Sequence, residues 1–151
     1  EKIDLFYPDG YTHGNLGMVW GYRVLSPEFP FEEGAGWEDD EWQKAILMMT
    51  DGINTIPPYY GAYKGYLDYV DEGINKAELD ERFEAVCENL RQEGVLVYTV
   101  TFTSGVDATT RGYYERCATA PTKYINAPSQ DDLIAAFEKI STELSNLHIS
   151  K

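Results

Sequence analysis

The stretch AILMMTDGINT, residues 45–55, decides the fold. Its first five residues, Ala45 to Met49, form an unbroken apolar run that ends at a threonine, Asp51 and a glycine. A short apolar run bounded by turn residues is typical of a strand buried on both faces, as in a parallel sheet covered by helices. Ligands of open α/β sheets bind beyond the carboxyl ends of the strands. Asp51 therefore follows a predicted strand at the position where binding or chemistry usually occurs.

Two later segments are predicted to be strands of the same sheet. Residues 95–102, VLVYTVTF, are β-branched and aromatic, and residues 122–127, TKYINA, form a third and shorter strand. Four amphipathic segments alternate with the three strands. The order helix, strand, helix, strand, helix, strand, helix predicts an α/β fold with a Rossmann-like, open, mostly parallel sheet and crossover helices.

Each predicted helix has a boundary signal and an apolar face. The signals are Pro27 after the first helix, Asn75 with Glu78 before the second, Asp107 before the third and Ser129 with Asp132 before the fourth. In the order of the four helices, the apolar faces consist of Leu16, Val19, Trp20 and Val24; Leu79, Phe83, Val86, Cys87 and Leu90; Tyr113, Tyr114 and Cys117; and Leu133, Phe137, Ile140, Leu144 and Leu147. The second helix is expected to end near Gly94.

The composition excludes several classes of partner. The chain carries 26 acidic and 12 basic residues, which give a net charge of −14. Nucleic acid and anionic membranes repel such a surface, so neither is expected as a partner, whereas divalent cations and basic proteins fit better. No stretch approaches the length of a membrane span, and we expect no membrane insertion by this segment.

Two polar segments each allow two interpretations. Residues 28–41, EFPFEEGAGWEDDE, contain seven carboxylates and form either a solvated connector or a calcium loop, although no alternating ladder of acidic ligands is present. An insertion at about residues 53–74 is rich in tyrosine. Its tyrosines are Tyr59, Tyr60, Tyr63, Tyr66 and Tyr69. They either form a surface that binds a partner protein or pack the insertion onto the domain.

The common catalytic signatures are absent from the sequence. There is no phosphate-binding loop, no serine nucleophile elbow and no His-Glu-x-x-His zinc motif. His13 and His148 are interpreted as lone surface residues, although His13 adjoins Thr12 and could line a site. The protein is therefore expected not to be an enzyme, and a hydrolase that uses Asp51 among its carboxylates is the remaining alternative.

Thr12, in DGYTHG, and Asp51, in MTDG, are the candidate ligands for a metal ion. Hard cations such as Mg²⁺ take oxygen ligands and keep several waters, so a hydroxyl and a carboxylate from two loops at one edge of a sheet can form part of such a site. The alternatives are structural, because threonine before a helix is often a cap and aspartate after a strand is often a turn former.

The two cysteines, Cys87 and Cys117, lie on the predicted helices before and after the strand at residues 95–102. Successive right-handed crossovers that advance in one direction place their helices side by side on one face of the sheet. The two sulfur atoms could therefore meet. Two separate buried thiols are the alternative, because Cys87 belongs to an apolar face.

Five segments together resemble von Willebrand factor type A domains: GYTHGNLGMVWGYRVLSPEFPF, KAILMMTDGINT, AVCENLRQEGVLVYTVTF, YYERCAT and LIAAFEKISTELSNL. The most similar branch occurs in tight-adherence (Flp-type) pilus assembly proteins of bacteria, which carry such a domain after an amino-terminal membrane anchor. The match covers nearly the whole chain. Residues 1–151 are therefore expected to form a single domain of this type, with helices on both faces of its sheet.

The resemblance implies a metal-ion-dependent adhesion site. In this family three loops hold a divalent ion: an Asp-x-Ser-x-Ser, a threonine, which Thr12 matches, and an aspartate, which Asp51 matches. Mg²⁺ is expected, with Mn²⁺ or Ca²⁺ as alternatives. No Asp-x-Ser-x-Ser occurs in the sequence. We therefore expect the chain to be the carboxyl-terminal part of the domain, roughly two thirds to three quarters of it. A separate segment or chain would then supply the rest and cover the flank of the strand at residues 45–49.

The resemblance also implies a function. We expect a non-enzymatic module that recognises a protein partner, a pilus or surface component, with a partner carboxylate completing the coordination of the ion. A structural component of the same machinery, with a vestigial metal site, is the alternative. The implied location is extracytoplasmic in a bacterium, with the full-length protein anchored in the membrane. Such a location favours a disulfide between Cys87 and Cys117.

Overall fold

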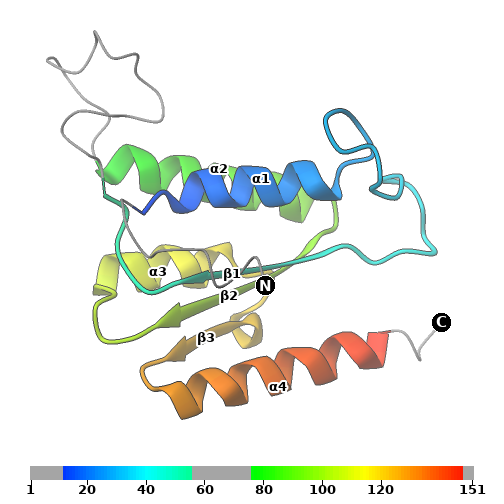
Figure 1. Ribbon diagram of the computed structural model, residues 1–151. Coiled ribbons are helices and arrows are strands. Elements are labelled where there is room, and N and C mark those ends of the chain that lie inside the picture. Colours follow the sequence, from blue (N-terminus) through cyan, green and yellow to red (C-terminus); the bar gives the residue numbers. More distant parts are fainter. Residues whose placement is uncertain (1–11, 56–75, 148–151) are drawn as a thin grey trace, which may run out of the picture.

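The computed structural model describes residues 12–55 and 76–147 (Figure 1). In this part of the chain, four α-helices alternate with three β-strands in the predicted order. The helices are α1 (Gly14–Leu25), α2 (Lys76–Gln92), α3 (Ala108–Cys117) and α4 (Gln130–Leu147), and the strands are β1 (Ala45–Thr50), β2 (Leu96–Phe102) and β3 (Tyr124–Ala127). The predicted α/β class with a Rossmann-like sheet is confirmed.

The three strands form one parallel sheet in the order β1, β2, β3. Ala45 pairs with Leu96, and Thr99 pairs with Tyr124. A short 3-10 turn, Pro121–Lys123, precedes β3, so this strand begins at Tyr124 rather than at residue 122. Because all strands run in one direction, the loops that follow β1 and β2 lie at the same edge of the sheet.

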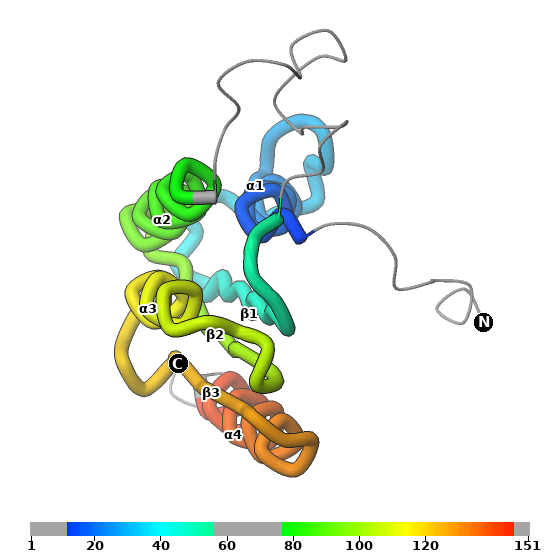
Figure 2. The backbone as a smooth tube through the Cα atoms, turned by 90° about the vertical axis from the view of Figure 1, so that its left-hand side faces the viewer, coloured from blue at the N-terminus to red at the C-terminus, as the bar shows by residue number. Residues whose placement is uncertain are grey.

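Helices cover both faces of the sheet, as predicted. Figure 2 shows α1, α2 and α3 on one side and α4 on the other. The core on the α1, α2 and α3 side is built from Met18, Phe83, Cys87, Leu90, Val95, Val97, Tyr113, Tyr114 and Cys117. The core beneath α4 is built from Tyr98, Val100, Ala127 and Ile140. Alternate residues of β2 thus serve opposite cores, because successive side chains of a strand point to opposite faces.

Local capping signals begin the last two helices. The Asp107 carboxylate accepts a hydrogen bond from Thr110 N at 2.7 Å at the start of α3. At α4, Asp132 N donates to Ser129 Oγ and Ser129 N donates to Asp132 Oδ2, both at 3.2 Å. This reciprocal pair satisfies two backbone donors that the first helical turn leaves open.

The strand β1 differs from the prediction of burial on both faces. Ile46 and Met48 pack against the core that α1 covers. Leu47 and Met49 point to the other face and are 38% and 44% exposed. Within residues 12–55 and 76–147, no strand pairs with the outer edge of β1. The prediction is therefore wrong for one face of this strand, because α4 packs mainly on β3 and β2.

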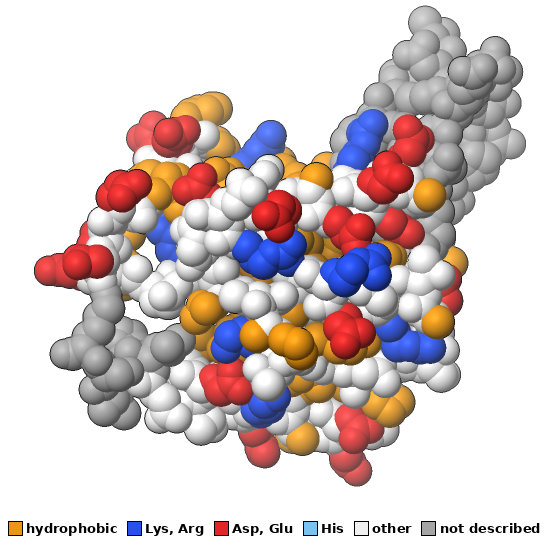
Figure 3. Space-filling model, turned by 180° about the vertical axis from the view of Figure 1, so that it is seen from behind, with side chains coloured by type: hydrophobic (Ala, Val, Ile, Leu, Met, Phe, Trp, Pro, Cys, Tyr) orange, Lys and Arg blue, Asp and Glu red, His pale blue; other side chains and the backbone are white. Residues whose placement is uncertain are grey.

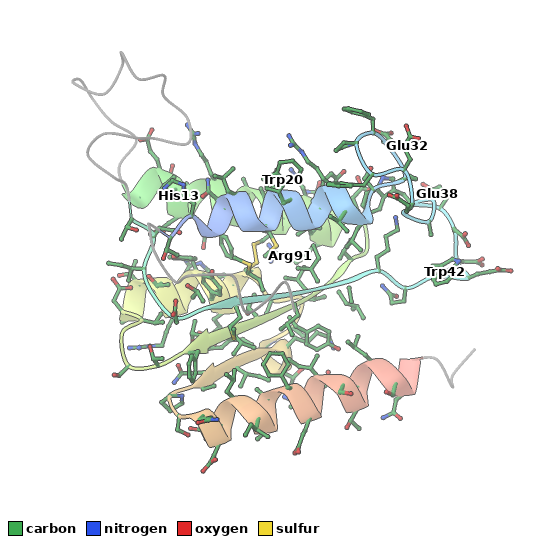
Figure 4. All side chains as sticks on the ribbon, in the orientation of Figure 1. His13, Trp20, Glu32, Glu38, Trp42 and Arg91 are labelled. Atoms are coloured by element: carbon green, nitrogen blue, oxygen red, sulfur yellow. A yellow bond between two sulfur atoms is a disulfide. The ribbon has the colours of Figure 1, made fainter. Side chains whose placement is uncertain are left out.

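A disulfide joins Cys87 of α2 to Cys117 of α3, with a Cα–Cα distance of 5.2 Å. The two helices pack side by side on one face of the sheet (Figure 2). Arg91 lies next to the bond in Figure 4 and donates from Nη1 to the carbonyl oxygens of Arg116 and Cys117, at 2.6 and 3.0 Å. Of the two alternatives for the cysteines, the paired one is observed.

Several predictions fall outside the described residues. They concern the tyrosine-rich segment from Tyr59 to Tyr69, the cap at Asn75, His148 and the side chain of Leu147. Among the helices that the structure describes, none is both long and apolar enough to cross a membrane.

Candidate functional site

The structure brings Thr12 next to the loop that follows β1. Thr12 N donates to Thr55 Oγ1 at 2.9 Å, and Thr55 N donates to the carbonyl oxygen of Thr12 at 2.9 Å. A Cβ atom built on Gly52 would lie 3.9 Å from Thr12 Oγ1. Thr12 and Asp51, the neighbour of Gly52, therefore lie at the same edge of the sheet, although they are 39 positions apart in the sequence.

The oxygen atoms of these two side chains have no hydrogen-bond partner among the described residues. Asp51 is exposed and Thr12 is half-buried. The main chain of Asp51 is held in place, because its carbonyl oxygen accepts a hydrogen bond from Thr103 Oγ1 at 3.2 Å. A fixed backbone with unpaired side-chain oxygens is an arrangement in which a ligand can be bound with little loss of conformational entropy.

The loop after β1 is a tight turn organised by Thr50. Its Oγ1 donates to Gly52 O at 2.9 Å and accepts from Gly52 N at 3.3 Å. Thr103, at the end of β2, has a φ of 75°, a left-handed conformation that is uncommon for threonine. Its hydroxyl also accepts from Gly105 N at 3.2 Å, so Thr103 joins the loop after β2 to the loop after β1. The sequence analysis missed Thr103, whose only local signal is the serine and glycine that follow it.

A buried polar network lies beneath these loops and is centred on Asn54. Its Oδ1 accepts from Gly14 N at 2.8 Å, while its Nδ2 donates to Asp80 Oδ1 at 2.8 Å and to the Tyr113 hydroxyl at 3.2 Å. Asn54 is 3% exposed. The network thus joins the first turn of α1, the loop after β1, α2 and α3. It fixes the position of the Thr12 loop relative to the Asp51 loop.

The tyrosines of this network stay protonated over the physiological pH range. Burial raises the pKa of Tyr114 to about 12, with the Asp80 carboxylate adding to the rise and a hydrogen bond with Thr50 opposing it. Burial likewise raises the pKa of Tyr113 far above its ordinary value. A Cβ on Gly14 would lie 3.1 Å from the Tyr114 hydroxyl, so the first turn of α1 approaches this ring closely. Both hydroxyls therefore remain hydrogen-bond donors.

His13 lies between Thr12 and α1, at the N-cap position (Figure 4). Its side chain makes no capping hydrogen bond. The residue is half-buried, and among the described residues its Nε2 atom is buried without a hydrogen-bond partner. The interpretation of His13 as a surface residue is therefore only partly correct, because one ring nitrogen faces the interior.

The donor set at this edge fits part of a site for a hard divalent cation. Thr12 offers a hydroxyl and Asp51 a carboxylate, and hard cations such as Mg²⁺ and Ca²⁺ take oxygen ligands. No group of three or more His, Cys, Asp or Glu residues suited to a metal ion occurs in the part of the chain that the structure describes. This finding also gives no support to a calcium loop at residues 28–41. Water, or residues from outside the described part, would supply the remaining ligands at Thr12 and Asp51.

One of three comparisons with known proteins, the one with solved structures, supports the fold. No protein-family model matches the sequence, and no curated protein matches it. Three solved structures of proximal thread matrix protein 1 from the mussel byssus match 91% of the chain at 19–20% identity, with TM-scores of 0.53, 0.57 and 0.56. The third of these structures has a zinc-occupied metal-ion-dependent adhesion motif. The likeness supports a von Willebrand factor A-like fold for this chain.

The chain spans only about a quarter of those neighbours, because the matches cover 26–28% of the mussel protein. At 19–20% identity the likeness concerns the fold alone. The likeness therefore assigns no function to this chain.

Proposed function

We propose that residues 1–151 form a single, non-enzymatic protein-binding module of the von Willebrand factor A type, which recognises its partner through a divalent cation at the carboxyl edge of the sheet. Thr12 and Asp51 would contribute the hydroxyl and the carboxylate on the protein side. A carboxylate of the partner would complete the coordination. The observation that carries the proposal is the placement of Thr12 Oγ1 beside the Asp51–Gly52 turn, with no hydrogen-bond partner for either ligand oxygen among the described residues.

The proposed ion is Mg²⁺, with Mn²⁺ and Ca²⁺ as alternatives. A hydroxyl and a carboxylate are the oxygen donors that Mg²⁺ accepts while it keeps several of its own waters. Bound at this edge, the ion would supply an open coordination position and a positive charge on a protein of net charge −14. A partner carboxylate would otherwise be repelled by that negative charge.

The outer edge of β1, which no strand pairs with in the part of the chain that the structure describes, supports the proposal that another segment or chain completes the domain. Leu47 and Met49 are exposed on one face, and backbone groups of an edge strand form a template for a further strand. A strand and its following loop, supplied by another segment or chain, would cover this edge. The same loop would then lie close enough to Asp51 to add the missing ligands of the adhesion site.

The biological setting belongs to the same proposal. The sequence resemblance to tight-adherence pilus assembly proteins supports a role at the surface of a bacterium, with a pilus or surface protein as the partner. The disulfide between Cys87 and Cys117 supports an extracytoplasmic location, because structural disulfides form and persist in oxidising compartments.

Titration of the full-length protein with Mn²⁺ and Mg²⁺, followed by calorimetry, tests the metal site. We expect Thr12→Ala and Asp51→Asn each to weaken ion binding by about tenfold or more, because each removes one ligand. Thr122→Ala and Asp40→Asn are matched controls, since both residues are exposed, precede β3 and β1 at the opposite edge of the sheet, and should leave affinity unchanged. Equal ion affinity in all four variants would show that Thr12 and Asp51 are not ligands of the ion. Partner binding that persists without any ion would favour the structural component with a vestigial site.

A further inference from the structure

A second surface lies at the opposite end of the sheet, where residues 26–44 connect α1 to β1. Connections longer than about 12–15 residues without secondary structure are uncommon in compact domains, and they are often functional. Seven carboxylates and a single lysine lie in residues 28–44. Figure 3 shows acidic side chains with hydrophobic ones between them at this end of the molecule, on its left side.

The connection is pinned to the body of the domain rather than loosely attached. Lys44 Nζ donates to the carbonyl oxygens of Leu25 and Ala35, and it lies 3.8 Å from the ring centroid of Trp37. Trp37 in turn stacks on Tyr22 of α1 at 5.3 Å. A Cβ on Gly34 would collide with the carbonyl oxygen of Leu25, so only glycine allows this close approach. The segment therefore presents its other side chains in a defined arrangement.

Large apolar side chains of this region face outward. Val24 is 55% exposed, Trp42 is 64% exposed and Phe29 is 86% exposed. The Trp20 ring packs edge to face on Phe31 at 5.9 Å, and Trp20 shares a face of α1 with Val24, four residues further on. Figure 4 places Trp20 midway along α1, and Glu32, Glu38 and Trp42 along the connection at one end of the molecule. Clustered exposed aromatic residues on a fixed backbone mark an interaction surface.

A groove of about 600 Å³ lies between Val24 and Trp42. Val24 and Trp42 form apolar walls, and the carboxylates of Glu33 and Glu41 also line it. The one cation that lines the groove, Lys44, is already engaged with two carbonyl oxygens and with Trp37. We name the set Trp20, Val24, Phe31, Glu33, Glu41 and Trp42 the acidic–aromatic surface.

Carboxylates beside this surface also act on neighbouring groups. Burial raises the pKa of Tyr22, and the carboxylates Glu93 and Glu28 raise it further. Burial lowers the pKa of Lys44, whereas Asp39 and Glu93 oppose that effect. A second copy of the chain would bring another net charge of −14 to the surface, so charge complementarity favours a basic partner over self-association.

We propose that the acidic–aromatic surface binds a cationic protein segment that inserts an aliphatic or aromatic side chain into the groove between Val24 and Trp42. Lysine or arginine residues on either side of that anchor pair with Glu33 and Glu41. The surface lies at the amino end of β1, whereas Thr12 and Asp51 lie at its carboxyl end. Binding here therefore needs no metal ion and does not depend on the adhesion site.

The three tryptophans of residues 1–151 make the test specific. They are Trp20, Trp37 and Trp42, all in or beside this surface, so the intrinsic tryptophan fluorescence of this chain reports on it. The chain of residues 1–151 is titrated in EDTA with a short synthetic peptide that alternates lysine with leucine and phenylalanine. Two matched peptides replace lysine by glutamate, or leucine and phenylalanine by serine. We expect saturable binding of the first peptide only, and weaker binding at high salt because the charges are exposed.

Variants of the groove residues test whether the lysine peptide binds there, and calorimetry measures the affinity of each variant for the peptide. Trp42→Ala and the double variant Glu33→Gln with Glu41→Gln are each expected to weaken it by about tenfold. The controls are Phe137→Ala and the double variant Glu115→Gln with Glu138→Gln, which remove an exposed aromatic ring and two exposed charges elsewhere. Unfolding midpoints of all variants are compared, so that loss of fold is recognised.

Four results would overturn the proposal. One is equal binding of the glutamate peptide, and another is no saturable binding of the lysine peptide. The third is an equal loss of peptide affinity in the control double variant, which would mean that the peptide responds to the net charge of the protein and not to Glu33 and Glu41. The fourth is self-association of the protein in sedimentation experiments in place of peptide binding. None of them bears on metal binding at Thr12 and Asp51, since EDTA is present throughout.

Discussion

Thr12 and Thr55 hold each other by two hydrogen bonds across 43 positions of sequence, both at 2.9 Å. One of these bonds is between a backbone N–H and a side-chain hydroxyl, and the other joins two backbone groups. The pair fastens the loop before α1 to the loop after β1, and this contact sets Thr12 beside Asp51. The geometry of the proposed adhesion site is thus fixed by Thr55, which is not itself a proposed ligand, as well as by the strand ends.

Replacing Thr55 by valine should loosen this connection. Thr55→Val keeps the shape of the side chain but removes the acceptor for Thr12 N, which we expect to lower the free energy of unfolding by about 1 kcal/mol. Mn²⁺ affinity should fall several-fold at the same time, because Thr12 is less well positioned. Urea unfolding and calorimetry measure the two effects. Thr109→Val, on the exposed face of α3, is the control and should change neither quantity.

Asn54 should be among the most sensitive polar residues. Asn54→Ala removes the acceptor of Gly14 N and donors to Asp80 and Tyr113, all in a buried site. Buried polar groups left without partners cost about 1–3 kcal/mol each, so we expect a loss of roughly 2–4 kcal/mol in urea unfolding. Asn89→Ala, at an exposed position of α2, should cost far less. A similar loss in both variants would mean that the network contributes little.

The fold could be predicted from local signals, whereas most of the site could not. Asp107, Ser129 and Asp132 act within three positions of their partners, so their capping roles can be recognised in the sequence. Asn54 depends on Gly14 and Asp80, which come from other elements and meet it only after the chain folds. Nothing next to Asn54 distinguishes it from a turn residue.

Burial of β1 was predicted from an apolar run and is correct for only one face. The run AILMM specifies a strand that needs cover on both sides, but it does not specify which segment provides that cover. Within the described residues, α1 covers Ile46 and Met48 and nothing equivalent covers Leu47 and Met49. The placement of Thr12 beside the Asp51 turn matches the sequence expectation of one shared edge, while metal binding there remains a prediction.

The disulfide should contribute strongly to stability. It closes a separation of 30 residues between α2 and α3, and cross-links of such length typically stabilise proteins by about 2–4 kcal/mol. Guanidinium unfolding with and without a reductant should show a loss of this size. The double variant Cys87→Ala with Cys117→Ala should be equally destabilised and insensitive to reductant. A reductant effect on that variant would show that another group is responsible.

The pair of Glu143 and Lys123 predicts a pH dependence. Burial opposes ionisation of Glu143, but hydrogen bonds from Lys123 and Tyr98 prevail and hold its pKa below the ordinary value. Burial also opposes the charge of Lys123, yet Tyr98 and Glu143 raise its pKa overall. Glu143 therefore stabilises the fold above its unfolded pKa of about 4.3, and Lys123 stabilises it below about 10.4.

The variant Glu143→Gln isolates this contribution. At pH 7 it should lower the free energy of unfolding by about 0.2–1 kcal/mol, the range of partly exposed ion pairs. The difference from the unmodified protein should shrink as pH falls below about 4, because Glu143 becomes protonated in the folded state. Urea unfolding at several pH values measures it. A difference that stays constant down to pH 2 would contradict the assignment.

The two faces of β1 should respond differently to a polar side chain. Met48→Ser places a hydroxyl against the core beneath α1 and should cost about 2–4 kcal/mol. Met49→Ser lies on the exposed face and should change stability by no more than about 0.5 kcal/mol. Thermal unfolding of residues 1–151 compares them. A large cost for Met49→Ser would mean that this face is covered after all.

Within the described residues the outer edge of β1 has no partner strand, and its geometry restricts which strand could pair with it. Such a strand would have to satisfy the backbone groups of the edge and also place apolar side chains beside Leu47 and Met49. A shift of one position along the edge would turn the incoming side chains to the wrong face. Only a strand whose apolar residues fall in the matching register could therefore complete the sheet.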